Sequence, residues 1–254
     1  MLSVIIPSYK DPLLNKTVES LLQNAKGDVE IICVLDGYWE APIDDPRVKL
    51  IHLGENKGMR NAINMGVRVA NGEYIMKLDS HCMVDEGFDI ALIEVHQDNW
   101  IQVPTRKRLD ADKWEIINDG RPDVDYLYLD ENLKGVLWNE RNNNLTLREK
   151  KIDDIVSFQG SCYFMKKDFF HKIRILDNKH FGPMGHESQE IVFKCWMKGG
   201  RVVRNKTTWY AHWHRTSSLK SPNSSRDKSR ECLAVWYGRR KKKIDRFIKL
   251  YGNK

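Results

Sequence analysis

The sequence lacks the long apolar segment that a membrane-spanning helix requires. None of its apolar runs approaches the roughly eighteen residues that cross a bilayer. The N-terminus shows neither a basic region nor a small-residue cleavage site, so no signal peptide is predicted. The 254 residues are 41% hydrophobic and 30% charged, which is typical of a globular protein. We therefore expect a cytoplasmic protein with one large domain or two small ones.

The cysteines lack the spacing of a metal-binding or disulfide framework. There are five of them, an odd number, and no two form a CxxC pair. They are scattered, mostly within apolar runs, at Cys33, Cys82, Cys162, Cys195 and Cys232. Reduced, buried thiols in a reducing compartment are the simplest interpretation, and zinc held by thiolates is not expected.

A glycine-rich phosphate loop is also missing after the first predicted strand. Pro7-Ser8-Tyr9-Lys10 stands at that position instead, so neither a dinucleotide fingerprint nor the loop typical of nucleotidyltransferases is present. Apolar runs nevertheless alternate with amphipathic segments through the first half of the chain. Strands are predicted at 2–6, 29–35, 48–53, 74–78 and 100–103, and helices at 13–24, 58–70 and 88–97. This alternation predicts a Rossmann-like parallel sheet with helices on both faces.

The pattern changes in the second half of the chain. Residues 105–154 are polar and irregular, with isolated aromatic residues, and are interpreted as a lid or an insert. Regular elements return afterwards, with strands predicted at 155–165 and 201–210 and helices at 167–173 and 187–198. The predicted organisation is a domain at 1–215, with a nucleotide-binding half at 1–104 and a second half at 155–215.

Positive charge is concentrated at the C-terminus. The chain carries a net charge of +7, and residues 221–254 hold eleven Lys or Arg against three Asp or Glu. A serine-rich linker at 216–225 precedes one predicted amphipathic basic helix. This tail could be a solvated helix that packs its apolar stripe on the domain. It could also contact an anionic membrane or nucleic-acid phosphates through residues 226–254.

One strand ends in a pattern that suggests a metal site. The apolar run 74–78 stops at Asp79-Ser80-His81, where residues two apart share a face if the extended conformation continues. Ligands bind at the carboxyl edge of open α/β sheets. One oxygen and one nitrogen ligand suit a divalent ion such as Mn²⁺. The alternative is that Asp79 caps a turn and that His81 is merely polar.

Several motifs together resemble a known family. Val4 to Tyr9, Val34 to Gly37, and the stretch from Asn56 to Ala62 are similar to family 2 glycosyltransferases with the GT-A fold. Later motifs resemble the polypeptide N-acetylgalactosaminyltransferases more specifically. These motifs are Leu78 to Cys82, Phe158 to Tyr163, Gly185 to Glu190, Lys194 to Trp196, and Gly199-Gly200. The resemblance covers roughly residues 1–104 and 155–215, and it implies that 155–215 is the acceptor and metal half of the domain.

The resemblance implies a fold, a donor and a metal site. The expected fold is α/β, a Rossmann-like GT-A domain with a mixed central sheet, which binds a UDP-sugar and Mn²⁺ or Mg²⁺. Asp79, His81 and His212 would hold the ion, with His214 as the competitor for the third position. Arg215 would lie near the β-phosphate. Asp36 would contact the uracil or ribose, unless it only closes a turn with Gly37. The nucleotide pocket would be completed by Pro7, Ser8, Tyr9, Lys57, Gly58 and Arg60, together with Asp79.

Two glutamates mark the predicted acceptor side. Glu187 and Glu190 lie three residues apart at a helix start, where the helix dipole stabilises carboxylates in any case. The resemblance implies that one contacts sugar hydroxyls and the other faces the acceptor. Inverting relatives use a carboxylate here as general base, whereas the resembled branch retains configuration. His186 and Ser188 replace the Gly and Asn of that branch, which leaves sugar identity and stereochemistry open.

The leading hypothesis is a metal-dependent glycosyltransferase. It would move a sugar, with GalNAc, GlcNAc and glucose as candidates, from a UDP-sugar to an acceptor hydroxyl on a glycan or a protein. A hydroxymethylated base in viral DNA is an alternative acceptor, favoured by the basic tail. A hypothesis of another class is an inactive GT-A domain that only binds nucleotide sugars.

Overall fold

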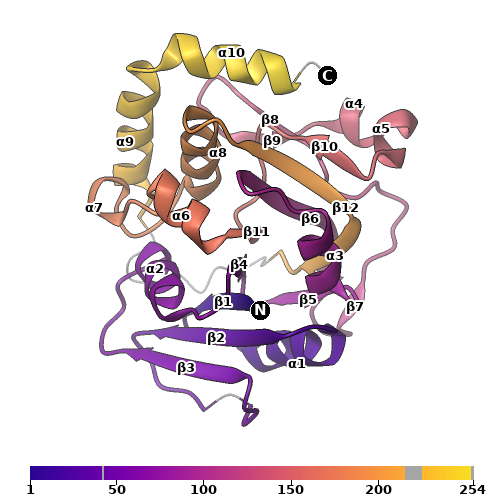
Figure 1. Cartoon of the computed structure of the whole chain (residues 1–254), viewed down its shortest axis with the longest axis vertical. Coiled ribbons are helices and arrows are strands. Elements are labelled where there is room, and N and C mark those ends of the chain that lie inside the picture. The colour runs from indigo at the N-terminus through magenta and orange to yellow at the C-terminus, as the bar shows by residue number, and fades with distance from the viewer. Residues whose placement is uncertain (42, 215–224, 253–254) are drawn as a thin grey trace.

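The computed structural model describes residues 1–41, 43–214 and 225–252. Ten strands of the described chain form one mixed sheet in the order β10-β12-β6-β11-β4-β1-β2-β3, with β5 added to β12 and β7 to β6 (Figure 1). The strands of the first half are β1 (Leu2–Ser8), β2 (Val29–Asp36), β3 (Val48–Leu53), β4 (Tyr74–Leu78) and β5 (Cys82–Val84). Strands β1 to β4 are parallel to one another, as their alternation with helices predicts.

Helices cover both faces of this parallel half because alternate strand residues point to opposite sides. Val4 and Ile6 of β1 pack with α1 (Leu14–Asn24), whereas Ile5 packs with α2 (Met59–Val69). Helix α2 approaches the sheet closely at Gly66, where a Cβ would lie 2.4 Å from Ile5 Cγ2. Helix α3 (Phe88–Glu94) follows β5 and is shorter than predicted.

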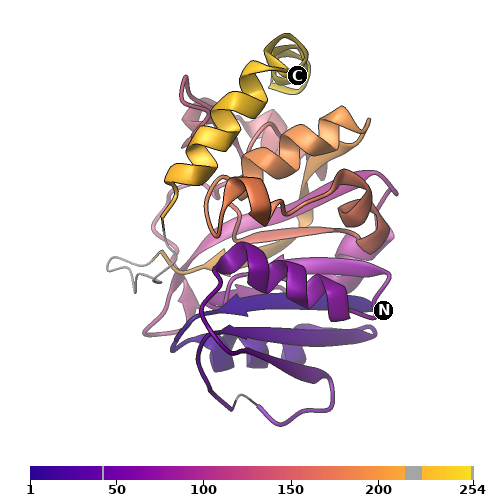
Figure 2. The same cartoon turned by 90° about the vertical axis from the view of Figure 1, so that its left-hand side faces the viewer.

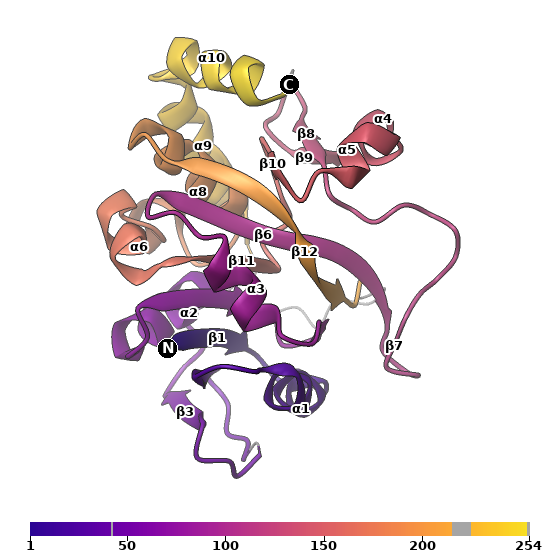
Figure 3. The same ribbon diagram turned by 45° about the vertical axis from the view of Figure 1, so that its right-hand side comes forward.

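The second half of the sheet is mixed, and its two long strands differ from the sequence prediction. Strands β6 (Trp100–Asp110) and β12 (Arg201–His212) run side by side in parallel (Figure 3). The prediction that Pro104 ends its strand is wrong. Pro104 pairs with Asn205, where the register of β12 shifts, and such an irregularity tolerates a residue without an N–H group.

Residues 105–154 contain more regular structure than predicted. They include β7 (Glu115–Ile116), β8 (Leu127–Leu129), β9 (Gly135–Leu137), α4 (Asn139–Asn142), α5 (Leu145–Glu149) and β10 (Ile152–Asp154). The buried amide of Asn142 organises this segment. Its oxygen accepts from the backbone N–H groups of Asp125 and Tyr126, and its nitrogen donates to the carbonyls of Tyr126 and Trp138. The segment is therefore an ordered part of the domain.

The strand predicted at 155–165 is interrupted. Only β11 (Cys162–Lys166) is a strand, antiparallel to β4, and the residues before it pass along the pocket described below. Three helices follow, α6 (Lys167–Ile173), α7 (Asn178–Phe181) and α8 (Glu187–Met197). None of the helices in the described ranges is long and apolar enough to cross a membrane.

The basic tail forms two helices rather than the single one predicted. Helices α9 (Asp227–Gly238) and α10 (Lys241–Gly252) lie beside α8 (Figures 1 and 2). Trp236 stacks on Phe193 of α8, with ring centroids 6.3 Å apart. Ile244 is fully buried in the main core. The apolar stripe of the tail therefore packs on the domain. Most of the predicted linker at 216–225 lies outside the described residues.

This packing predicts that the tail contributes to stability. Ile244→Ala should lower the free energy of unfolding by about 2 to 5 kcal/mol, because it leaves a cavity in the core. The matched control is Leu250→Ala on the same helix, where the side chain is 45% exposed and the loss should stay below about 1 kcal/mol. Urea unfolding followed by circular dichroism measures both. Equal losses would show that α10 is not anchored through Ile244.

Candidate functional site

A pocket of about 1030 Å³ opens at the carboxyl ends of the parallel strands. Its lining comes from the ends of β1, β2 and β4, from β6, and from the β8–β9 hairpin. The start of α2, the residues before β11, the start of α8 and the residue before α9 also contribute. Its size lies at the upper end of the range usual for small-molecule sites. The pocket is therefore large enough for a small-molecule ligand.

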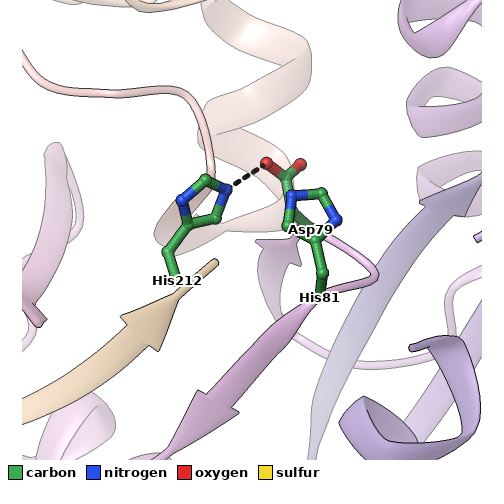
Figure 4. A group of neighbouring side chains, drawn as sticks. All are labelled: Asp79, His81 and His212. Carbon is green, nitrogen blue, oxygen red and sulfur yellow. Dashed lines mark ion pairs between the residues drawn. The ribbon is translucent and has the colours of Figure 1, made fainter. Parts of the chain in front are cut away.

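Asp79, His81 and His212 converge at this pocket edge (Figure 4). One possible ligand atom from each lies within 4.8 Å of the others. Asp79 follows β4, and His81 follows two residues later. His212 ends β12 and pairs with Cys82 of β5, so strand pairing places it beside His81. His212 Nε2 lies 3.3 Å from Asp79 Oδ2. The group could hold a divalent metal ion.

The protonation states of this group suit metal binding. Burial lowers the pKa of His212 to about 4, although Asp79 partly opposes this shift. Burial would raise the pKa of Asp79, but Lys77 and the two histidines bring it well below its ordinary value. At neutral pH the group thus offers an ionised carboxylate and a neutral imidazole at His212, the forms that bind metals. The buried Nδ1 of His212 has no hydrogen-bond partner in the described chain.

Neighbouring side chains fix the orientation of two members of the group. The ammonium of Lys77 contacts Asp79 and donates to the carbonyl of Gly160 at 2.6 Å. His81 Nδ1 lies 2.8 Å from Asp11 Oδ2, which also accepts from Ser80 Oγ at 2.6 Å. A carboxylate behind an imidazole is the usual support of a metal-binding histidine, because it fixes the ring and its tautomer.

The structure gives different surroundings to His212 and His214, the two candidates for the third metal ligand. His214 lies beyond the end of β12, and its Nε2 contacts the guanidinium of Arg106. Burial, and then Arg106 and Arg108, lower the pKa of His214. The group that converges on Asp79 contains His212 and not His214. Arg215, expected beside the diphosphate, lies outside the described residues.

Some of the residues expected to bind the nucleotide line the pocket, and others do not. Pro7, Ser8, Tyr9 and Asp36 line the pocket, at the ends of β1 and β2. Ser8 Oγ lies 2.6 Å from the hydroxyl of Tyr38, which sequence reasoning did not single out. Its location immediately after β2 and Asp36-Gly37 was the available signal.

Lys57 and Gly58 act on Asp36 rather than on the pocket. Their backbone N–H groups donate to the Asp36 carboxylate at 2.7 and 2.8 Å. Burial raises the pKa of Asp36, and these two hydrogen bonds oppose the shift. The Lys57 ammonium is exposed and lies 3.6 Å from Glu55. The carboxylate of Asp36 therefore holds the backbone at the start of α2 instead of closing a turn with Gly37.

Arg60 and Glu190 lie away from the pocket, which corrects the expectation for both. Their side chains are fully buried and form an ion pair with each other. The guanidinium of Arg60 also donates to the carbonyl of Gly185 at 2.6 Å, and Glu190 accepts from Lys194 at the same distance. The pair joins α2 to α8 and leaves neither charge for a substrate.

Glu187 is the glutamate of this helix that faces the pocket. Its Oε1 accepts from the N–H of Gly185 at 3.2 Å. A Cβ on Gly160 would lie 3.5 Å from its Oε2, so the carboxylate stands against the backbone that precedes β11. Glu187 and Glu190 thus have different surroundings although they share a helix face.

Asp11 and Lys77 were missed by sequence reasoning. Asp11 follows β1 and precedes Pro12, so an acid just after a buried strand was the available signal. Lys77 is a lysine inside an apolar strand, and it is 1% exposed. A charge at such a position needs a partner, which here is Asp79.

Comparisons with known sequences agree on one family. The sequence model described as "Glycosyl transferase family 2" matches residues 3–174. Glycosyltransferase GlyG of Streptococcus pneumoniae is 22% identical over 93% of this chain and 78% of its own length. Polypeptide N-acetylgalactosaminyltransferase 5 of Mus musculus is 26% identical over 74% of this chain. The chain spans only 22% of that mouse protein.

Solved structures show the same fold at low sequence identity. The crystal structure of GalNAc-T7 with UDP, GalNAc and Mn²⁺ is 20% identical, with a TM-score of 0.78, over 95% of this chain and 49% of that one. The structure of S. aureus TarS 1-349 in complex with UDP-GlcNAc is 16% identical, with a TM-score of 0.57, over 92% and 65%. These likenesses establish the fold.

The geometry predicts unequal effects of two histidine substitutions. His212→Ala should weaken Mn²⁺ binding by about tenfold or more, because it removes one of three ligands. His214→Ala, the matched control two residues away, should change the affinity by less than about threefold. Isothermal titration of Mn²⁺ into the protein with UDP measures both. The reverse order would assign the third position to His214.

Proposed function

Because the chain belongs to glycosyl transferase family 2, we propose that it transfers a sugar from a UDP-sugar to an acceptor hydroxyl with a bound divalent ion. The observation that carries the proposal is the convergence of Asp79, His81 and His212 at the edge of a pocket of substrate size. The solved GT-A structures with UDP, GalNAc and Mn²⁺ or with UDP-GlcNAc support a UDP-sugar as donor.

The three converging residues would hold Mn²⁺ or Mg²⁺. The bound ion would supply positive charge that stabilises the leaving diphosphate. Lys77 keeps Asp79 ionised and directed at the site, and Asp11 holds the ring of His81. The nucleoside would lie over the ends of β1 and β2, against Ser8, Tyr9 and Asp36.

Glu187 is the group proposed to face the acceptor. It lines the pocket at the start of α8, whereas Glu190 is neutralised by Arg60. If the enzyme inverts configuration, Glu187 accepts the proton of the acceptor hydroxyl. If it retains configuration, Glu187 positions that hydroxyl by a hydrogen bond. Glu187 would have the same substrate contact in both mechanisms.

The alternative of an inactive binding module has no specific support. All three predicted metal ligands are present, and the pocket beside them remains open. Loss of a ligand would have favoured that alternative. The basic side chains of α10 remain exposed. Contact with an anionic membrane or nucleic acid through residues 226–254 stays a prediction.

The donor proposal predicts a selective response to nucleotide sugars. UDP-GalNAc, UDP-GlcNAc or UDP-glucose should raise the melting temperature in the presence of Mn²⁺, whereas GDP- and CDP-sugars should not. Binding to the folded state alone stabilises the protein by mass action. Thermal-shift measurements with and without Mn²⁺ test this. A response only to GDP- or CDP-sugars, or none that depends on the ion, would contradict the proposal.

The role of Glu187 predicts a loss of activity without a loss of donor binding. Glu187→Gln should lower transfer by about 100-fold or more, within the range of general acid–base effects, while UDP and Mn²⁺ still bind. Glu231→Gln, an exposed acid on α9, is the control and should keep full activity. The anomeric proton of the product, followed by NMR, then distinguishes inversion from retention. Full activity of Glu187→Gln would remove it from the reaction.

A further inference from the structure

Positive charge exceeds negative charge in the pocket lining. Six basic side chains line it against three carboxylates. The basic residues are Lys77, Arg106, Arg108, Arg121, Lys134 and Arg226. The carboxylates belong to Asp36, Asp79 and Glu187. A pocket lined in this way attracts anions and raises their local concentration.

Only two of the basic residues are paired with carboxylates in the described chain. Lys77 pairs with Asp79, and Arg121 pairs with Asp119 outside the pocket. For Arg106, Arg108, Lys134 and Arg226 the described residues provide no carboxylate at ion-pair distance. The residues outside the description, 42, 215–224 and 253–254, contain no Asp or Glu. No acidic side chain of the described chain therefore forms an ion pair with these four charges, and only Arg108 has carboxylates at longer range, those of Asp119 and Asp123.

Of the four basic residues, Arg106 gives the strongest evidence for an anion site, because its side chain is buried. It is only 8% exposed, and burial lowers its pKa. Its guanidinium contacts the imidazole of His214, which offers no negative charge at neutral pH. Burying an arginine without a counter-charge costs free energy, and an anion from outside the chain would offset that cost.

Arg108 is held beside Arg106 by the backbone of the neighbouring segment. The two arginines lie two residues apart on β6 and so share a face. Arg108 donates to the carbonyl of Pro122 at 3.1 Å, and Val124 donates from its N–H to the carbonyl of Arg106 at 3.0 Å. Two fixed guanidinium groups on one face suit the oxygens of a phosphate or a carboxylate.

These charges come from elements other than those proposed to hold the nucleoside. The nucleoside is assigned to the ends of β1 and β2, and the diphosphate to the ion at Asp79, His81 and His212. Arg106 and Arg108 belong to β6, Lys134 to the β8–β9 turn, and Arg226 precedes α9. Arg108 lies opposite His212 in the pairing of β6 with β12, so the two arginines border the proposed ion site. An ion bound there would offset the charge of the diphosphate, which leaves the charge of the arginines available to a second substrate.

We propose, as an extension of the proposed function, that the acceptor is an anionic glycan whose phosphate or carboxylate is held by Arg106 and Arg108 beside the reacting hydroxyl. Either oxyanion satisfies the same two arginines. A sugar unit can enter the pocket and reach a side chain that is almost fully buried. The phosphates of duplex DNA lie on the outside of a rigid helix and cannot reach Arg106 in this way.

Small probes test the charge requirement directly. In the presence of saturating UDP and Mn²⁺, sn-glycerol 3-phosphate is compared with glycerol, and glucuronate with glucose, by isothermal titration. At least one charged probe should bind about tenfold or more tightly than its neutral partner, as expected for a charge-assisted hydrogen bond. The charged probe that binds more tightly identifies the oxyanion. Arg106→Gln and Arg108→Gln should each reduce the difference by about tenfold.

Two further variants complete the design. Arg246→Gln removes the same charge from the exposed face of α10 and should leave the discrimination unchanged. Lys134→Gln, at an exposed turn position, keeps the test available if an Arg106 variant does not fold. It should reduce the discrimination by a smaller factor, about threefold.

The possible outcomes separate this inference from the proposed function. If the protein does not bind UDP with Mn²⁺, the proposed function fails. If it binds them but charged and neutral probes bind alike, only the inference fails. It is also overturned if Arg106→Gln weakens UDP binding more than probe binding, because the arginines then serve the donor. A 20-base-pair DNA duplex could also displace glycerol 3-phosphate from the protein. If it does so, and if the Arg106→Gln variant no longer binds the duplex, the assignment to a glycan is overturned.

Discussion

The pairing of β12 with β5 and β6 is the constraint on which the site depends. His212, the last residue of β12, lies opposite Cys82 on one side and Arg108 on the other. Strand β5 begins immediately after Asp79-Ser80-His81, so its pairing with β12 fixes His212 near both Asp79 and His81. A slip by one residue would turn His212 to the opposite face of the sheet. One register therefore brings together side chains that are far apart along the chain and could hold a metal ion.

The distribution of buried charge explains which ionisable groups remain open to substrates. Arg60 and Glu190 neutralise each other between α2 and α8, and that pair fixes the start of α8 without offering charge to the pocket. Glu187, three residues earlier, is left facing the pocket. The first turn of α8 thus carries one carboxylate held in an ion pair, Glu190, and one that faces the pocket, Glu187.

Local sequence patterns were sufficient to predict the strands and helices of the parallel half of the fold. Strands β2, β3 and β4 and helices α1 and α2 lie within one or two residues of the predicted bounds, because each shows a clear apolar period. The mixed character of the sheet came only from the family resemblance and is confirmed. Pro104 and the segment 105–154 were mispredicted for a different reason. Their structure depends on a register shift in β12 and on the buried amide of Asn142, which are long-range contacts.

The site was predictable where chemistry and strand ends coincide, as at Asp79 and His81. Sequence could not distinguish Glu187 from Glu190, because both share a helix face and only the distant Arg60 separates them. It also could not show that Arg106 lacks a carboxylate, since the polar segment around it gives no pairing information. Burial and pairing are properties of the folded chain, and both decide whether a charge is structural or available.

The departure from the resembled branch at His186 is explained by its contact with α9. His186 Nδ1 lies 2.8 Å from Ser229 Oγ, and a Cβ at Gly185 would lie 2.6 Å from the same atom. The turn before α8 is therefore packed against α9, whose preceding residue, Arg226, lines the pocket. A substitution of His186 would alter both the pocket wall and the contact that holds α9 against the turn before α8. The starts of α8 and α9 therefore form one continuous part of the pocket wall.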